Sequence, residues 1–259
     1  MSGTPSADEL LDVAVQAARV SGALLAQRFA TGGERAVDTK SSVNDPVSEA
    51  DHASERAIRE VLDTRRPDDG IMGEEGEDVA GTSGLRWIVD PLDGTVNFLY
   101  GIPQWCVSIC CEDRVGVVFD PVRDELFAVV AGEASTLNGA PLPERRAPAG
   151  GLAGALVATG FGYEARVREQ QARVVREVVP RVRDIRRAGS AALDLAWCAA
   201  GRVDAYYEHG VKTWDIAAGA LLCRGVGLRV EPLPAGDERP AGLLAAPAEI
   251  AGELVDLVA

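Results

Sequence analysis

Apolar residues recur at helical spacing in two stretches near the start of the chain. Ser6 precedes Glu9 by three positions, the pattern of a capping box, so we predict a helix from there to about Phe29. Its apolar face consists of Leu10, Ala14, Ala17, Ser21, Leu24 and Leu25. A second helix is predicted to begin near Ser48, and residues 30–47 between the two are interpreted as strand and loop. The second helix carries Ala50, Ala53, Ala57, Ile58, Val61 and Leu62 on its apolar face.

A short apolar run, Trp87-Ile88-Val89, is β-branched and bounded by breakers, so it predicts a buried strand that ends at Asp90-Pro91. The chain then turns through Asp93-Gly94 into Thr95, a residue type that caps helices. Two acids three positions apart on such a turn can converge on one point. Like charges that close repel, which indicates a cation site. The alternative is a strand exit with two solvated acids.

Strand-like runs at 105–111, 115–119 and 126–131 predict an antiparallel meander. Residues 132–154 are rich in Gly, Ala and Pro and carry turn signals, so we predict a boundary there. The chain would then consist of an N-terminal half, residues 1–150, and a C-terminal half, residues 151–259.

Strands and helices alternate more clearly in the second half. Strands are predicted at 155–159, 181–187 and 203–208, followed by two weak strands in the tail. Helices are predicted at 165–179, from Ser190-Ala191 to Ala200, from Trp214-Asp215 to Leu222, and at the C-terminus.

Composition and charge narrow the range of functions. Asp plus Glu number 40 against 26 Lys plus Arg, a net charge of −14, which disfavours binding to nucleic acid. No apolar run is long enough for a membrane span and no secretory signal is visible, so we expect a cytoplasmic protein without membrane contact. The five cysteines lack paired spacing and are interpreted as buried, reduced thiols.

Four acids stand at the ends of predicted elements: Glu74 between glycines, Asp90 and Asp93 after the strand, and Asp215 at a helix start. Such oxygen ligands, with no nearby His or Cys cluster, favour Mg²⁺ or Mn²⁺ over zinc. The chain has only two histidines and lacks both a Gly-x-Ser-x-Gly elbow and a Walker-type loop. Read alone, Asp51 near the start of the second helix is interpreted as an acid that interacts with the helix dipole.

The stretch Asp90-Pro91-Leu92-Asp93-Gly94-Thr95-Val96-Asn97-Phe98 resembles the first signature of the inositol monophosphatase family of lithium-sensitive sugar phosphatases. Trp214-Asp215-Ile216-Ala217-Ala218-Gly219-Ala220 resembles the second. The segments Gly73-Glu74-Glu75 and Ala205–Glu208 also match in the right order. The resemblance implies an α/β fold, a layered αβαβα sandwich with a mostly antiparallel first sheet and a mixed second sheet. A homodimer is implied at the level of the family.

The same resemblance implies two or three Mg²⁺ ions per site, for which Mn²⁺ could substitute. Glu74, Asp90 and the Leu92 carbonyl would hold the first ion, and Asp90, Asp93 and Asp215 the second. A third would use Glu74, with Asp51 in its outer shell. Gly94 and Thr95 would bind the phosphate of the substrate, and Thr95 with Glu74 would activate a water molecule. Lys40 and Asp51 are assigned supporting roles.

Substrate specificity is assigned by the resemblance to Glu208, whose carboxylate would accept hydrogen bonds from a polyol. Ser190 and Ala191 would line the same pocket, whereas His209 is interpreted as a surface or packing residue. The expected function is Mg²⁺-dependent hydrolysis of inositol monophosphate by activated water. Alternatives on the same fold are a histidinol-phosphate phosphatase and a phosphatase of other small sugar phosphates, including fructose 1,6-bisphosphate. A nucleotide 3′-phosphatase is disfavoured, and a partner-binding protein that retains the fold is the non-enzyme alternative.

Overall fold

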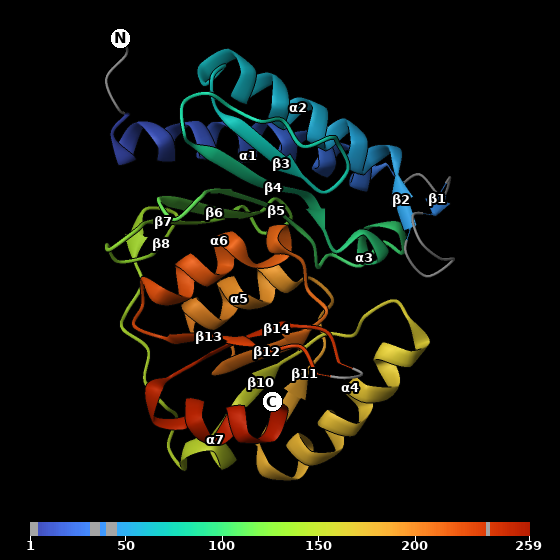
Figure 1. The fold of residues 1–259 in the computed structure, drawn as a ribbon, viewed down its shortest axis with the longest axis vertical. Coiled ribbons are helices and arrows are strands. Elements are labelled where there is room, and N and C mark those ends of the chain that lie inside the picture. Colours follow the sequence, from blue (N-terminus) through green and yellow to red (C-terminus); the bar gives the residue numbers. More distant parts are fainter. Residues whose placement is uncertain (1–4, 32–36, 40–45, 237–238) are drawn as a thin grey trace.

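The fold is a stack of five alternating helix and sheet layers (Figure 1). The computed structural model describes residues 5–31, 37–39, 46–236 and 239–259. From one side of the stack to the other, the helix layers are α1 (Ala7–Ala30) with α2 (Glu49–Arg65), α5 (Ala191–Ala200) with α6 (Thr213–Arg224), and α4 (Ala165–Val178) with α7 (Ala248–Val258). The predicted αβαβα sandwich is therefore confirmed.

The first sheet has seven strands in the order β3-β4-β5-β6-β7-β8-β9. Only β3 and β4 run parallel, and every other neighbouring pair is antiparallel, as expected for the first sheet. The strands are β3 (Gly70–Gly73), β4 (Arg86–Asp93), β5 (Cys106–Cys111), β6 (Val115–Asp120), β7 (Glu125–Val130), β8 (Thr136–Leu137) and β9 (Ala140–Pro141). The short helix α3 (Thr95–Leu99) follows β4 directly.

The second sheet has five strands in the order β11-β10-β12-β14-β13. Two neighbouring pairs are parallel and two are antiparallel, so the predicted mixed sheet is confirmed. The strands are β10 (Leu156–Ala158), β11 (Asp184–Arg186), β12 (Ala205–His209), β13 (Arg229–Leu233) and β14 (Gly242–Ala246). A separate antiparallel pair is formed by β1 (Val37–Thr39) and β2 (Pro46–Ser48), and 3₁₀ turns lie at Gly151–Gly154 and Val179–Arg181.

The strands of the first sheet are apolar on both faces because helices cover both faces. In β4, Trp87 and Val89 pack into the core beneath α1 and α2, whereas Ile88 packs into the core around α5 and α6. Alternate side chains of a strand point to opposite faces, so a sheet covered on both faces needs continuous apolar runs. The same burial accounts for the cysteines, all of which are buried and free, as predicted.

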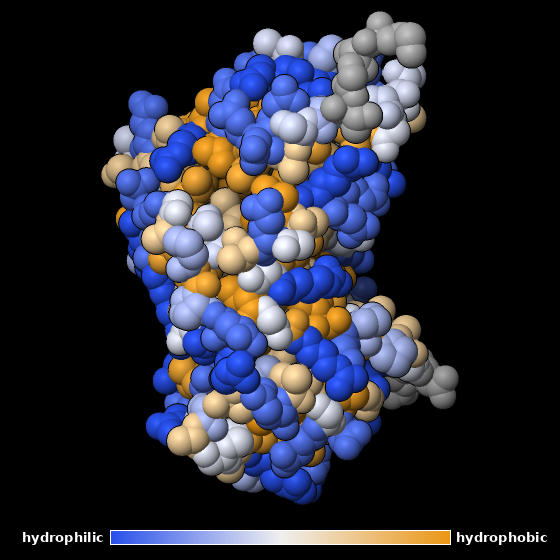
Figure 2. All heavy atoms as spheres, turned by 90° about the vertical axis from the view of Figure 1, so that its left-hand side faces the viewer, coloured by the Kyte–Doolittle hydropathy of each residue, from blue (hydrophilic) through white to orange (hydrophobic). Residues whose placement is uncertain are grey.

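On the face shown in Figure 2, hydrophobic residues form clusters between polar ones. In the described ranges, no helix combines the length and the apolar character needed to cross a bilayer. The two sheets follow one another in sequence, but α5 and α6 pack against both of them. The predicted boundary near residue 150 stays a prediction.

Candidate active site

A bulge in β4 aims two acids into one pocket. Asp90 pairs with Ser108 of β5 and Asp93 pairs with Cys106, so three steps along β4 match two along β5. Residues three apart in a regular strand point to opposite faces, but the extra residue turns the strand, and both acids line the same cavity. The prediction that the strand ends at Asp90-Pro91 is therefore wrong, because pairing continues to Asp93.

Gly94 forms the sharp turn that ends β4. Its φ is +102°, and a Cβ atom at this position would lie 2.8 Å from the carbonyl oxygen of Gln104, so only glycine fits. Gly94 is the N-cap of α3, and Thr95 is the first helical residue. The prediction that Thr95 caps a helix is therefore wrong. Its hydroxyl instead lies 2.9 Å from Asp51 Oδ1 and 3.2 Å from the Leu92 carbonyl oxygen.

The acid-lined cavity has a volume of about 400 Å³ and lies between the two halves of the chain. It collects residues from six separate segments. All of the predicted site residues line it: Glu74, Asp90, Leu92, Asp93, Gly94, Thr95, Ser190, Ala191, Glu208 and Asp215. Lys40 lies outside the described residues. The roles of these residues stay predictions, whereas their convergence on one cavity is a structural finding.

Each carboxylate in the cavity makes ionisation of its neighbours less favourable. Burial raises the pKa of Asp90 well above its ordinary value, and the charges of Glu74, Asp93 and Asp215 raise it further. Burial also raises the pKa of Asp215, and the charge of Asp93 adds to that effect. A bound cation would reverse both shifts, because it favours the ionised carboxylates.

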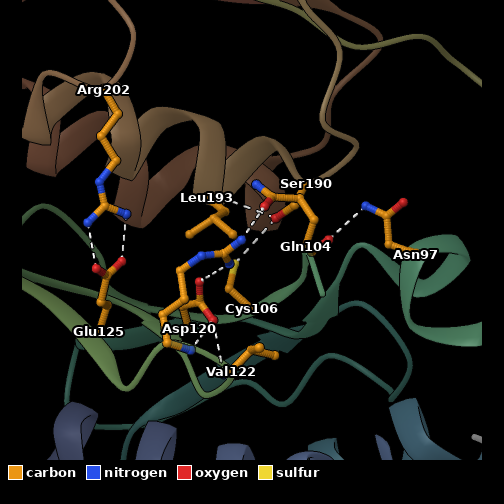
Figure 3. Close-up of polar contacts among 10 residues, drawn as sticks. Asn97, Gln104, Cys106, Asp120, Val122, Glu125, Ser190, Leu193 and Arg202 are labelled. Atoms are coloured by element: carbon orange, nitrogen blue, oxygen red, sulfur yellow. Dashed lines mark hydrogen bonds and ion pairs between the residues drawn. The ribbon is translucent and has the colours of Figure 1, made fainter. Parts of the chain in front are cut away.

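Asp93 is held by the second half of the chain. Its Oδ2 atom accepts hydrogen bonds of 2.7 Å from the Ser190 hydroxyl and 2.7 Å from the Ala192 backbone N–H, at the N-terminus of α5. Burial raises the pKa of Asp93 to about 6, and these two hydrogen bonds oppose the rise. The Ser190 hydroxyl also lies 3.5 Å from the thiol of Cys106 (Figure 3). The first sheet and α5 therefore meet at Asp93.

Asp215 is the third residue of α6, and its Oδ2 atom accepts a 2.6 Å hydrogen bond from the backbone N–H of Lys212. This contact fixes the carboxylate at the start of the helix, where it lines the cavity together with Glu74. A helix N-terminus stabilises a carboxylate. The prediction that Trp214-Asp215 opens a helix is confirmed with a one-residue difference, since α6 begins at Thr213.

The donor set fits a hard divalent cation, because it consists of carboxylate and carbonyl oxygens. Within residues 5–31, 37–39, 46–236 and 239–259, no three His, Cys, Asp or Glu side chains are already gathered into a ready-made cation site. The four acids line one cavity, and the predicted ligand assignment stays a prediction.

Glu208 also lines the cavity and lies near the end of β12. Its Oε2 atom accepts a 3.1 Å hydrogen bond from the Tyr206 hydroxyl, while burial raises its pKa to about 7. Gly160, after the neighbouring strand β10, provides the space for this carboxylate, since a Cβ atom there would lie 2.1 Å from Glu208 Oε1. His209 is 2% exposed, and its ring nitrogens lie 3.0 and 2.8 Å from the carbonyl oxygens of Pro240 and Val258, so it is a packing residue.

Three residues near the site were missed or only partly understood from the sequence. Asp51 lies in the first turn of α2 as predicted, but it is also 1% exposed and contacts Thr95, which the local sequence did not reveal. Gly160 gave no local signal of its contact with Glu208. Asp194 is 2% exposed in the first turn of α5, and burial and the charge of Glu208 raise its pKa. A lone acid in the apolar segment Ala191–Ala200 was the signal that could have revealed it.

The chain combines a five-layer αβαβα fold with a cavity lined by four acids, and comparisons with known proteins show which class of protein this is. The family model described as the inositol monophosphatase family matches residues 6–255. The chain belongs to the inositol monophosphatase family and is a phosphatase.

Curated relatives carry two kinds of name. Inositol-1-monophosphatase SuhB of Mycobacterium tuberculosis is 49% identical over 210 residues, which cover 76% of this chain and 72% of the relative. Nus factor SuhB of Escherichia coli is 40% identical over 224 residues, which cover 84% of this chain and 83% of the relative. Among solved structures, the extragenic suppressor protein suhB of Bartonella henselae shares the fold with a TM-score of 0.87 and 34% identity, over 96% of this chain and 98% of that one.

Proposed function

We propose that this protein is a Mg²⁺-dependent phosphomonoesterase that hydrolyses inositol monophosphate by attack of an activated water molecule. The observation that carries the proposal is the single cavity in which Glu74, Asp90, Asp93 and Asp215 face the Gly94-Thr95 turn. The name inositol-1-monophosphatase on several relatives supports the choice of substrate.

The acids divide into two overlapping ligand sets in this proposal. Glu74, Asp90 and the Leu92 carbonyl would hold one Mg²⁺, and Asp90, Asp93 and Asp215 a second. A third ion would use Glu74, with Asp51 behind it. Bound divalent cations supply a nucleophilic hydroxide near neutral pH and neutralise charge on the phosphoryl oxygens. Mn²⁺, which takes similar oxygen ligands, could substitute.

The turn after β4 would bind the phosphate group through Gly94 and Thr95. The hydroxyl of Thr95 lies 2.9 Å from Asp51 Oδ1, which orients its hydrogen towards that carboxylate. A lone pair of Thr95 Oγ1 is then available to accept a hydrogen bond from the attacking water. Glu74, which lines the same cavity, would accept the proton that this water loses.

Glu208 would select the alcohol part of the substrate, with Ser190 and Ala191 beside it. A carboxylate only accepts hydrogen bonds, so vicinal hydroxyls of a polyol are suitable partners. The ammonium group of histidinol phosphate would also suit an acid, and fructose 1,6-bisphosphate presents hydroxyls. These two phosphomonoesters are therefore the alternative substrates to be tested.

A panel assay tests the function. Phosphate release is measured from inositol 1-phosphate, histidinol phosphate, fructose 1,6-bisphosphate and 3′-phosphoadenosine 5′-phosphate, each with Mg²⁺ and with chelator. We expect Mg²⁺-dependent turnover that is fastest with inositol 1-phosphate and is inhibited by Li⁺. Absence of turnover of every compound with Mg²⁺ present would contradict the phosphatase proposal, and a faster rate with another compound would reassign the substrate.

A second role as a binding partner is suggested by the relatives that are named Nus factors. We infer that such a role would accompany catalysis rather than replace it, because the four predicted acid ligands Glu74, Asp90, Asp93 and Asp215 all line the cavity. The free, buried cysteines agree with a cytoplasmic location, where thiols stay reduced. The homodimer expected from the family is tested by sedimentation of the purified chain, in which a single species of one-chain mass would contradict it.

A further inference from the structure

The loop that carries Glu74 is anchored from beneath by α2. Glu55 of α2 is buried, with a side chain 4% exposed, and its two carboxylate oxygens accept the backbone N–H groups of the two residues after Glu74. The hydrogen bonds measure 2.8 Å from Glu75 N to Oε2 and 2.9 Å from Gly76 N to Oε1. Glu55 therefore fixes the orientation of the peptide planes that immediately follow Glu74.

Arg59, one turn further along α2, completes this anchor. Its Nε atom donates a 2.7 Å hydrogen bond to Glu55 Oε1, and its Nη2 atom donates to the Glu77 carbonyl oxygen at 3.1 Å. The Glu55 carboxylate thus accepts two N–H groups of the loop, and the Arg59 guanidinium donates to one of its carbonyl oxygens. Such charge-assisted hydrogen bonds are stronger than neutral ones, and the ion pair compensates the buried charge of Glu55.

The glycines of the segment Gly73-Glu74-Glu75-Gly76 make room for the same carboxylate. A Cβ atom at either Gly73 or Gly76 would lie 2.4 Å from Glu55 Oε1. Neither glycine has a positive φ, so close approach rather than an unusual backbone conformation explains their presence. The sequence around Glu74 is thus shaped to fit Glu55.

We propose that Glu55, supported by Arg59, is a positioning residue that holds Glu74 against the repulsion of the other acids. Glu74 lines the same cavity as the carboxylates of Asp90, Asp93 and Asp215, and like charges gathered in one cavity repel one another. Residues 76–80 are exposed, so the loop has little burial of its own to keep Glu74 in place. This inference rests on the proposed function only in assigning Glu74 to the metal site.

Glu55→Gln is the most informative variant because it keeps the size of the side chain. Its amide can accept one of the two loop N–H groups, but its NH₂ group then faces the other donor. Outer-shell substitutions typically weaken metal affinity or activity by about 10–100-fold. We therefore expect the Mg²⁺ concentration for half-maximal turnover of inositol 1-phosphate to rise by about 10-fold or more, with kcat largely restored at saturating Mg²⁺.

Two further measurements separate positioning from general loss of stability. Amide hydrogen exchange of residues 74–77 should become faster in Glu55→Gln, while exchange in β4 stays unchanged. The increase in Tm on addition of Mg²⁺ should be smaller in Glu55→Gln than in the wild type. In a protein that already carries Glu74→Gln, adding Glu55→Gln should not reduce this Mg²⁺-dependent increase in Tm any further. Arg59→Met should shift the Mg²⁺ midpoint in the same direction by a smaller factor, because Glu55 remains.

Asp69→Asn is the matched control. Asp69 is also a buried acid, 4% exposed, paired with Arg66 and hydrogen-bonded to Trp87 Nε1 at 2.9 Å. It lies at the opposite end of β3 and β4 from the cavity, since it immediately precedes Gly70, which is paired with Arg86. We expect Asp69→Asn to lower Tm without any change in the Mg²⁺ midpoint.

The outcomes distinguish this inference from the proposed function. Wild-type protein without Mg²⁺-dependent turnover would overturn the proposed function. Mg²⁺-dependent wild-type turnover, together with an unchanged Mg²⁺ midpoint in folded Glu55→Gln and Arg59→Met, would overturn only the role of Glu55. Equal shifts of the midpoint in Asp69→Asn and Glu55→Gln would also overturn it, because they would show an effect of stability alone.

Discussion

The hydroxyl of Ser190 donates a 2.7 Å hydrogen bond to Asp93 Oδ2, across 97 residues of sequence. Ser190 is also the N-cap of α5, where its side chain accepts the Leu193 N–H at 3.4 Å. One serine therefore caps the start of α5 and holds an acid of the first sheet. A second link between the halves is the pair of hydrogen bonds from Arg202 to the Glu125 carboxylate (Figure 3).

Ser190→Ala should weaken both the fold and the site. Loss of an N-cap and of a hydrogen bond to a carboxylate predicts a decrease of about 1–3 kcal/mol in the free energy of unfolding. The pKa of Asp93 should rise further, because the Ser190 hydroxyl now lowers it. Urea denaturation and the Mg²⁺ dependence of turnover measure the two effects.

Ser6→Ala provides the comparison for Ser190→Ala, because Ser6 caps α1 far from the cavity with a 3.1 Å hydrogen bond from Glu9 N. It should cost about 1 kcal/mol of stability and leave the Mg²⁺ midpoint unchanged. If the two serine variants changed the Mg²⁺ midpoint equally, the link to Asp93 would have no functional role.

Asp90→Asn should nearly abolish turnover while it preserves the fold. Removal of a charge that stabilises the reacting group predicts a loss of about 10²–10³-fold in kcat or more. The amide keeps the oxygen that accepts the Leu92 N–H at 3.1 Å. Because Asp90 is opposed by three other acids, the variant without Mg²⁺ should unfold at or above the wild-type Tm, and Mg²⁺ should stabilise it less. Full activity in this variant would contradict the bridging role of Asp90.

The order of elements could be predicted from the sequence because it depends on local patterns. The apolar run at Trp87 and the capping box at Ser6 each specify one element, and the structure contains both. The direction of Asp93 could not be predicted, because it depends on the bulge opposite β5. The cap at Gly94 was missed for a similar reason, since the approach of Gln104 imposes it from outside the local sequence.

The four acids could be singled out because each stands beside a breaker or at an element end, and the family resemblance supplied the other site residues. What stayed hidden were the contacts that orient those acids. Ser190 was predicted to line the pocket but not to hold Asp93, and the glycines around Glu74 gave no indication of which side chain approaches them. Such contacts join residues far apart in sequence, so they cannot be predicted from a local pattern.

Gly160→Ala should act through Glu208. The added methyl group would lie within van der Waals overlap of the Glu208 carboxylate and displace it from the cavity. Loss of a hydrogen bond to a charged group is worth about 1.5–3 kcal/mol, so KM for inositol 1-phosphate should rise by about 10–100-fold with a smaller change in kcat. Steady-state kinetics of Gly160→Ala, Glu208→Gln and the double variant test this. The KM of the double variant should not exceed the KM of the more strongly impaired single variant.

Gly252→Ala is the neutral comparison for Gly160→Ala, since it lies within α7 and a Cβ atom there meets open space. It should leave KM unchanged and increase stability slightly, because alanine favours helices over glycine. Additive effects of Gly160→Ala and Glu208→Gln on KM would contradict the steric explanation.

The stability of the metal-free protein should depend on pH through Glu208. Burial raises the pKa of this group from 4.5 to about 7, so the folded chain binds more protons than the unfolded chain between these values. The protonated carboxyl therefore contributes its full stability below about pH 4.5, and the contribution is lost as the pH rises through about 7. Glu208→Gln is neutral at every pH, so its free energy of unfolding should increase relative to wild type across this range. Urea denaturation with chelator at several pH values measures the difference, and parallel curves for the two proteins would show that Glu208 has an ordinary pKa in the folded chain.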